Sequence, residues 1–201
     1  NAYQPDLKLI PNAHQLFDLL VLMGGPQSVD DPSMNDFFSP YYELVKNMLT
    51  IKNRKIIGIC LGAQILSKVL GGNVEKGKNG VEAGFAIVQI PDKSDFVFKG
   101  IPENSGFAFH LHEDTFSIPK NAKLLLKSEL YENQMFSYED RVFGIQCHLE
   151  ATYPMIEAWS DIHRDFIAKS PNAYPILDGD LQQDSAAFGE KIFKNILMKK
   201  L

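Results

Sequence analysis

The sequence predicts an α/β fold in which helices cover both faces of a mostly parallel, twisted sheet, forming a three-layer sandwich. Two nearly continuous apolar runs, at residues 17–23 and 55–59, are typical of strands buried on both faces, as in parallel sheets. A segment with helical periodicity follows each run. Because strands that alternate with helices form right-handed crossovers, these observations together indicate the α/β class.

The first strand, residues 17–23, ends at Gly24-Gly25-Pro26. Farther along, Ser39 and Pro40 are the residue types of a helix N-cap and a first helical position, so we expect a helix to begin there. Apolar residues then recur at helical spacing and predict its buried face. They are Tyr41, Leu44, Val45, Met48 and Leu49.

The second strand, residues 55–59, runs directly into Cys60. Residues 61–70 then have the pattern of a helix, which Gly71-Gly72 ends. The middle of the chain, residues 74–132, is richer in alternation and in turn residues. It predicts shorter strands joined by loops.

The last third of the chain predicts one more strand and two helices. The strand is residues 141–147, and Thr152 is placed to cap the helix that follows. Residues 171–184 are expected to form a loop before the final helix. The predicted buried stripes are Met155 or Ile156, Trp159, Ile162 and Phe166 in the first helix, and Phe188, Ile192, Phe193, Ile196 and Leu197 in the second.

The length of 201 residues predicts one domain over residues 1–201, large enough to bury a substantial core. The net charge of −5 argues against a broad surface for nucleic acid or anionic membranes. No apolar run approaches the roughly 18 residues that a membrane span needs, and the start does not resemble a signal peptide. Two cysteines are too few for a disulfide scaffold, so we expect a cytoplasmic protein.

The segment from Gly58 to Gly62 has the G-x-nucleophile-x-G form of a strand-to-helix turn, with Cys60 at its centre. Such a tight turn leaves no room for side chains two positions on either side of the nucleophile. It also places the sulfur at a helix N-terminus, where the N–H groups and the helix dipole favour the thiolate. The N–H group of Leu61 is placed to donate to an oxyanion. The alternative is a packed cysteine whose neighbouring glycines serve only packing.

A second constellation, at the end of the strand over residues 141–147, contains His148 and Glu150. A thiolate nucleophile needs a base to move its proton, and the base needs an acceptor that orients it. Residues two apart on a strand project to the same side, so Glu150 can orient His148 toward Cys60. Cys147 projects to the opposite face and is predicted to be a packed cysteine.

These motifs, with others between them, resemble the class I glutamine amidotransferases, which use a catalytic triad, and in particular their free-standing GMP-synthase-like subgroup. The likeness covers essentially the whole chain. The matching segments, in order, are Gly24-Gly25-Pro26, GICLGAQ from Gly58, EAGF from Glu82, HEDTF from His112, LLKS from Leu125 followed by Gln134, and GIQCHLE from Gly144.

The resemblance implies the flavodoxin-like fold of this family and its chemistry. Cys60 would attack the side-chain amide of glutamine and form a γ-glutamyl thioester with loss of ammonia. His148 would move the proton, and Glu150 would orient His148. The backbone N–H groups of Gly25 and Leu61 would form the oxyanion hole.

The resemblance also implies substrate-binding residues. Gln64 matches a position that helps to hold the bound glutamine. His112 and Asp114 would line the rim of the active site, although a satisfied surface pair is an equal alternative. Trp159 and His163 are expected to be packing or surface residues.

The chain departs from the family pattern in two ways. The family usually has an aromatic residue before the catalytic histidine and a proline after it, where this sequence has Cys147 and Leu149. The family also begins with a strand and a helix before the strand that leads to Gly24. Only a short segment, residues 2–10, stands in that place here, so we expect the first βα unit to be missing from the given sequence.

No metal and no cofactor are predicted. His110, His112 and Cys147-His148 lack the close ligand pairs of zinc sites and the helical H-E-x-x-H pattern. Gly71-Gly72 does not fit a dinucleotide fingerprint, and the sequence contains no P-loop.

Three functions remain open at the level of the sequence. The first is glutamine hydrolysis that supplies ammonia, and a separate synthase subunit is then a candidate partner because this chain offers no acceptor domain. The second is hydrolysis of another γ-glutamyl compound by the same residues, as in γ-glutamyl peptidases. The third is a non-enzymatic scaffold or redox sensor built on Cys60. His148 and Glu150 argue against this last function, because a sensor needs no proton relay.

Overall fold

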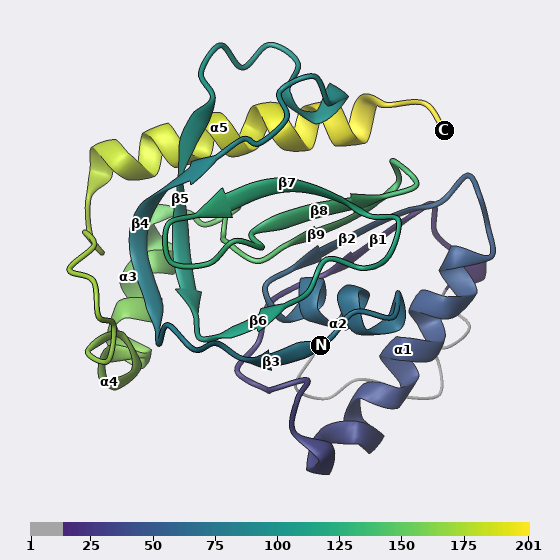
Figure 1. The fold of residues 1–201 in the computed structure, drawn as a ribbon, viewed down its shortest axis with the longest axis horizontal. Coiled ribbons are helices and arrows are strands. Elements are labelled where there is room, and N and C mark those ends of the chain that lie inside the picture. Colours follow the sequence, from purple (N-terminus) through teal and green to yellow (C-terminus); the bar gives the residue numbers. More distant parts are fainter. Residues whose placement is uncertain (1–13) are drawn as a thin grey trace.

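The computed structural model describes residues 14–201 (Figure 1). Residues 2–10, interpreted above as what precedes the first strand, lie outside the described part. A twisted sheet forms the centre of the molecule, with α5 along one face and α1 and α2 along the other. Within the described part, no helix is long and apolar enough to cross a membrane.

The main sheet has the strand order β1-β2-β9-β8-β7-β4-β5. Its first three strands pair in parallel, and the remaining pairs are antiparallel. Two short strands, β3 and β6, form a separate antiparallel pair. The bounds are β1 Leu19–Leu22, β2 Lys55–Ile59, β3 Val74–Lys76, β4 Glu82–Gln89, β5 Ser105–His112, β6 Asp114–Phe116, β7 Lys123–Ser128, β8 Met135–Tyr138 and β9 Val142–Ile145.

Five α-helices and short 3-10 helices complete the described part of the chain. Helix α2 connects the turn after β2 to β3, and α5 ends the fold. The helices are α1 Asn35–Leu49, α2 Leu61–Val69, α3 Tyr153–Ile162, α4 Arg164–Ile167 and α5 Gly179–Met198, with 3-10 helices at Pro32–Met34 and Phe96–Phe98.

Strand β2 shows why the fold has three layers. Its side chains alternate between two hydrophobic clusters, one on each face of the sheet. Ile56 belongs to the cluster that includes residues of α1 and α2, whereas Ile57 and Ile59 belong to the cluster that includes residues of α5. A strand covered on both faces must be apolar throughout, as its sequence indicated. The predicted three-layer α/β fold is therefore confirmed.

The first helix begins five residues earlier than predicted. Helix α1 starts at Asn35, and Pro40 lies inside it instead of at its first position. The residues before Pro40 explain the difference, because Phe37 and Phe38 pack at helical spacing against the rings of Tyr41 and Tyr42. The stability gained from these contacts offsets the loss of the backbone hydrogen bond that a proline inside a helix removes.

The final helix also begins earlier than predicted. Asp178 caps α5, and its carboxylate accepts hydrogen bonds from the N–H groups of Asp180 and Leu181. Part of the predicted loop 171–184 is therefore helical. Of its predicted buried stripe, Phe188, Ile192 and Ile196 are indeed buried.

Three predictions of burial are wrong. In α5, Leu197 is 49% exposed, because it lies in the last turn of the helix. In α3 only Ile156 is buried, and Ile162 is 73% exposed, because the helix ends there and the chain continues into α4. In β1, Leu19 and Val21 are 37% and 43% exposed. Strand β1 lies at the edge of the sheet as described, so one of its sides has no neighbouring strand.

Candidate active site

Three neighbouring parallel strands end at the same edge of the sheet, and a predicted site residue follows each of them. Gly25 follows β1, Cys60 follows β2 directly, and His148 follows β9. The crevice at the carboxyl ends of parallel strands is where α/β proteins usually bind ligands. The topology therefore brings together three segments that are far apart in the sequence.

The turn after β2 holds Cys60 in a strained conformation. Its φ of +51° lies in the left-handed region, which side chains other than glycine rarely adopt. Two glycines make the turn sterically feasible. A Cβ atom on Gly58 would lie 2.4 Å from the carbonyl oxygen of Gly62, and one on Gly62 would lie 2.1 Å from that of Leu22. The predicted need for small residues on both sides of Cys60 is confirmed.

Gly24 lets the segment after β1 approach the reactive side chains. A Cβ atom at Gly24 would lie 3.3 Å from Cβ of Cys60 and 3.4 Å from Cε1 of His148. The next residue, Gly25, lies close to the side chain of Leu61 at the start of α2. The backbone around Gly25 and the first turn of α2 thus face the same cavity as Cys60.

The carboxylate of Glu150 orients the ring of His148. Its Nδ1 atom lies 2.7 Å from Oε1 of Glu150, and its ring lies 4.9 Å from that of Trp159. Burial alone would lower the pKa of His148. Hydrogen bonding to Cys60 and Glu150 outweighs burial and raises this pKa to about 10, so the protonated ring is favoured.

The backbone of His148 is fixed as well. It exchanges two hydrogen bonds with the backbone of Phe109 in β5, from His148 N to Phe109 O at 2.7 Å and from Phe109 N to His148 O at 3.3 Å. This isolated antiparallel bridge lies beyond the end of β9. The histidine is therefore anchored between two parts of the sheet.

A buried glutamine, not singled out in the sequence, contacts the sulfur of Cys60. The side chain of Gln146 donates from Nε2 to Sγ of Cys60 at 3.6 Å, and its Oε1 accepts from Nε2 of Gln64 at 3.2 Å. Its place two residues before His148, on what the sequence predicts as one extended segment, was the available signal. Cys147, between them, is fully buried in the core, and burial raises its pKa well above the usual value. This agrees with its predicted packing role.

One cavity of about 560 Å³ joins all of the predicted site residues. Trp159 and His163, expected to be packing or surface residues, also line it, as does Phe166. They come from α3 and α4, whose apolar pattern in the sequence resembled an ordinary buried stripe. The predicted residues that line the cavity are Gly25, Cys60, Leu61, Gln64, His112, His148 and Glu150.

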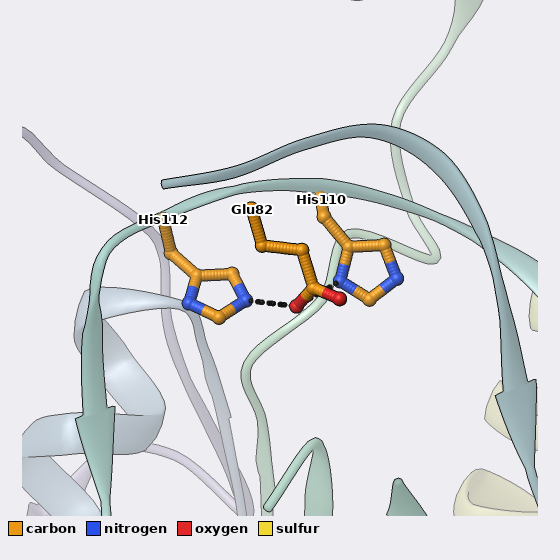
Figure 2. Close-up of side chains that lie close together, drawn as sticks. All are labelled: Glu82, His110 and His112. Carbon is orange, nitrogen blue, oxygen red and sulfur yellow. Dashed lines mark hydrogen bonds and ion pairs between the residues drawn. The ribbon is translucent and has the colours of Figure 1, made fainter. Parts of the chain in front are cut away.

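A second group of titratable side chains lies beside this cavity (Figure 2). Glu82 of β4 is fully buried, and its Oε2 atom lies 2.9 Å from Nε2 of His112 and 3.1 Å from Nδ1 of His110. Burial opposes ionisation of Glu82, but the two histidines hold the pKa of its carboxyl well below the usual range. Burial lowers the pKa of His110 and keeps its ring neutral. In the sequence, Glu82 was noted only as the first residue of the EAGF segment, and its contacts with His110 and His112 were not predicted.

Comparisons with known proteins point to one family. The family model for class-I glutamine amidotransferases matches residues 2–156. The glutamine amidotransferase-like protein YfeJ of Salmonella typhimurium is 34% identical over 161 residues, which cover 74% of this chain and 63% of that protein. A glutamine-hydrolysing GMP synthase subunit of Sulfolobus acidocaldarius is 33% identical over 153 residues, which cover 75% of this chain and 76% of that protein.

A plant hydrolase and a solved structure extend the likeness. Gamma-glutamyl peptidase 4 of Arabidopsis thaliana is 27% identical over 159 residues, covering 74% of this chain and 61% of that protein. The crystal structure of a glutamine amidotransferase from Thermotoga maritima matches with a TM-score of 0.78 and 27% identity, covering 92% of this chain and 80% of that one. The chain thus spans less than two thirds of the length of YfeJ and of the peptidase. With the family model matched over most of its length, the chain belongs to the class I glutamine amidotransferase family.

Proposed function

We propose that this protein hydrolyses the side-chain amide of glutamine with Cys60 as nucleophile and His148 and Glu150 as its proton relay. The observation that carries the proposal is the pairing of a strained, cavity-facing cysteine with a histidine that Glu150 orients at 2.7 Å. A nucleophile, a base and an orienting acceptor are the parts that acyl transfer needs.

The reaction would proceed in two halves. The thiolate of Cys60 attacks the amide carbon, and the oxygen gains negative charge that the N–H groups of Gly25 and Leu61 stabilise. The C–N bond then breaks, His148 gives its proton to the leaving nitrogen, and ammonia departs from the thioester. In the second half, water attacks the thioester, His148 takes up the proton of the water, and glutamate is released.

The electrostatics support this order of events. The raised pKa of His148 means that its ring is protonated at neutral pH, stabilised by hydrogen bonding to Cys60 and Glu150. A protonated imidazole beside the sulfur favours the thiolate, which is the reactive form. The same proton is in place for the leaving nitrogen. In the first turn of α2, the N–H groups of Ala63 and Gln64 donate to the carbonyl oxygen of Cys60. The first N–H group of a helix, here that of Leu61, has no acceptor within the helix and can bind an oxyanion.

A separate protein is the proposed consumer of the ammonia. The relative from Sulfolobus acidocaldarius is, by name, one subunit of a glutamine-hydrolysing GMP synthase. We propose that this chain likewise supplies ammonia to a synthase partner.

The second candidate function is hydrolysis of γ-glutamyl peptides by the same residues, in line with the resemblance to gamma-glutamyl peptidase 4. The specific observation that favours it is the size of the cavity. Its volume of about 560 Å³ exceeds what a single amino acid fills, and Trp159, His163 and Phe166 extend its wall beyond Cys60 and His148. Such a wall could receive the part of a peptide beyond the leaving nitrogen.

Steady-state kinetics on glutamine and on a panel of γ-glutamyl dipeptides separate the two functions. Higher kcat/KM for glutamine supports the amidotransferase, and higher kcat/KM for a dipeptide supports the peptidase. Cys60→Ala is expected to abolish both activities. Cys147→Ala, a matched change at the other buried cysteine, is expected to retain them. Normal turnover by Cys60→Ala would refute the proposed nucleophile.

A further inference from the structure

The group of Glu82, His110 and His112 owes its geometry to one pair of strands. In the antiparallel register of β4 and β5, Glu82 is paired with His112, and Gly84 with His110. Residues two apart on β5 project to the same face, so both imidazoles reach the same carboxylate (Figure 2). Because all three side chains are buried, bulk water does not solvate this carboxylate.

We propose that Glu82, His110 and His112 form a binding site for a divalent transition-metal ion, Zn²⁺ in the first place. One oxygen and two imidazole nitrogens are a ligand set that zinc uses in proteins. The three candidate ligand atoms all lie within 4.8 Å of one another. Ligands at about 2.0–2.2 Å from a tetrahedral ion are roughly 3.3–3.6 Å apart. Oε2 of Glu82 lies 3.1 Å from Nδ1 of His110 and 2.9 Å from Nε2 of His112, so the side chains would have to move apart slightly to bind an ion.

The second ring nitrogen of His112 supports this assignment. Nδ1 of His112 lies 3.1 Å from the backbone oxygen of Asp114. A carbonyl oxygen can only accept, so Nδ1 of His112 carries a proton and is not the nitrogen that would bind an ion. Nε2, within hydrogen-bond distance of Oε2 of Glu82 at 2.9 Å, is therefore the ring nitrogen that would bind an ion, which would replace this hydrogen bond. Metal-bound histidines commonly donate their other N–H to a carbonyl in this way.

Polar atoms without partners supply the rest of the coordination shell. Among the described residues, Oε1 of Glu82, Oε1 of Gln134 and both ring nitrogens of His110 have no hydrogen-bond partner although they are buried. The 3.1 Å contact of His110 to Glu82 lacks the direction of a hydrogen bond. Such atoms are costly in a folded protein unless something binds them. Coordination would satisfy Nδ1 of His110, with Oε1 of Glu82 or of Gln134 as a further ligand.

Gln134 also has the position of an outer-shell residue. Its Nε2 atom donates to Oε2 of Glu82 at 2.7 Å and to Oγ of Ser128 at 3.0 Å. Hydrogen bonds of this kind orient a carboxylate that binds a metal. His112 lines the active-site cavity, which gives an ion a route to the site.

The ion would stabilise the walls of the active-site cavity and would take no part in the hydrolysis. Phe109, whose backbone is hydrogen-bonded to that of His148, lies directly before His110 in the sequence. Asp114, whose carbonyl orients His112, accepts a hydrogen bond at 2.6 Å from Ser28, which also lines the cavity. An ion bound by β4 and β5 would hold these walls in place and stabilise the fold.

Metal analysis of the full, untagged chain tests the proposal. After incubation with Zn²⁺ and removal of excess ion, the wild type is expected to retain about one zinc per chain by mass spectrometry of the metal. Zinc is also expected to raise the Tm of the wild type. Glu82→Gln, which preserves volume, should lose both effects, and so should His112→Gln. His163→Gln removes a histidine outside the group and should retain the zinc.

A competing site at the reactive cysteine is separated by two further measurements. Cys60→Ala should still bind zinc, and loss of zinc in that variant would assign the ion to the cysteine and overturn the proposal. Co²⁺ bound to the wild type should show visible bands without a sulfur-to-metal charge-transfer band, because the proposed ligands are nitrogen and oxygen. This spectrum does not depend on any variant. A wild type that takes up no zinc, or a Glu82→Gln protein that takes up as much, would equally refute the site.

Discussion

The conformation of Cys60 depends on the two glycines around it more than on its own side chain. In β2, Ile56 and Gly58 face the side of the sheet that α2 covers, and a Cβ atom at Gly58 would lie 2.4 Å from the carbonyl oxygen of Gly62 in α2. Gly62 makes the equivalent approach to β1. The positive φ of Cys60 is strain that these backbone contacts hold in place.

The first prediction concerns Gly62. In Gly62→Ala the new methyl group would meet the carbonyl oxygen of Leu22 at 2.1 Å, so the turn must shift. We expect a loss of about 1–3 kcal/mol in the free energy of unfolding and a marked loss of glutamine hydrolysis. Urea denaturation and an ammonia assay measure the two effects. Gly179→Ala is the control, because a Cβ atom at Gly179 would have no other atom within 4 Å and its φ is not positive. An unchanged Gly62→Ala protein would contradict this account of the turn.

At the scale of single residues, the sequence predicted those site residues that lie together in short segments. Cys60 between two glycines, and Glu150 two residues after His148, are local patterns whose geometry follows from a strand and its turn. Glu82 is different, because its relation to His112 depends on the register of β4 against β5. Register depends on turns and packing across the sheet, which a local pattern does not reveal.

At the scale of elements, two helix starts differ in how they are capped. The side chain of Asp178 accepts two backbone hydrogen bonds at the start of α5. Thr152, at the start of α3, makes no such bond. We therefore expect Asp178→Ala to lower the free energy of unfolding by about 1 kcal/mol, and Thr152→Ala to lower it by less than about 0.5 kcal/mol. Chemical denaturation of both variants checks the difference, and equal losses would contradict it.

Helices α5 and α1 show what limits the prediction of elements from sequence. Aspartate and glycine are frequent in turns, so Asp178-Gly179 predicts a loop from the sequence alone. In the structure, the hydrogen bonds of Asp178 show that a helix begins there. Proline is a frequent first residue of helices, so Pro40 was predicted to begin α1. The helix instead begins before Pro40, where Phe37 and Phe38 pack against each other. Side-chain contacts determine where α1 and α5 begin, whereas the sequence predicted that both helices exist.

At the scale of the whole molecule, the site is a consequence of strand order. Since β1, β2 and β9 are adjacent and parallel, their following turns must meet at one edge. The antiparallel strands beyond them extend the sheet toward β5, whose backbone reaches back to His148. The order of strands could be expected from the resemblance to the family. The size of the cavity and the wall formed by α3 and α4 required the packing of the whole chain.

The pairing of His148 with Cys60 and Glu150 also couples the stability of the molecule to pH. The ring of His148 has a pKa of about 10 in the folded protein against an ordinary value of 6.5. A raised pKa means that the folded state binds the proton more tightly, so protonation stabilises it. This contribution is fully present below about pH 6.5, decreases as pH rises above that value, and is lost as pH passes about 10.

The resulting prediction compares the wild type with His148→Gln, in which this proton is absent. The difference in their free energies of unfolding should be largest near pH 6, shrink steadily above pH 7, and approach a constant beyond about pH 10. Urea denaturation at intervals across that range measures it. Glu150→Gln removes the carboxylate partner of His148, so the decline should still begin near pH 6.5 but end at lower pH. A difference that is independent of pH would show that folding does not raise the pKa of His148, and the protonated ring proposed for the reaction would then have to be abandoned.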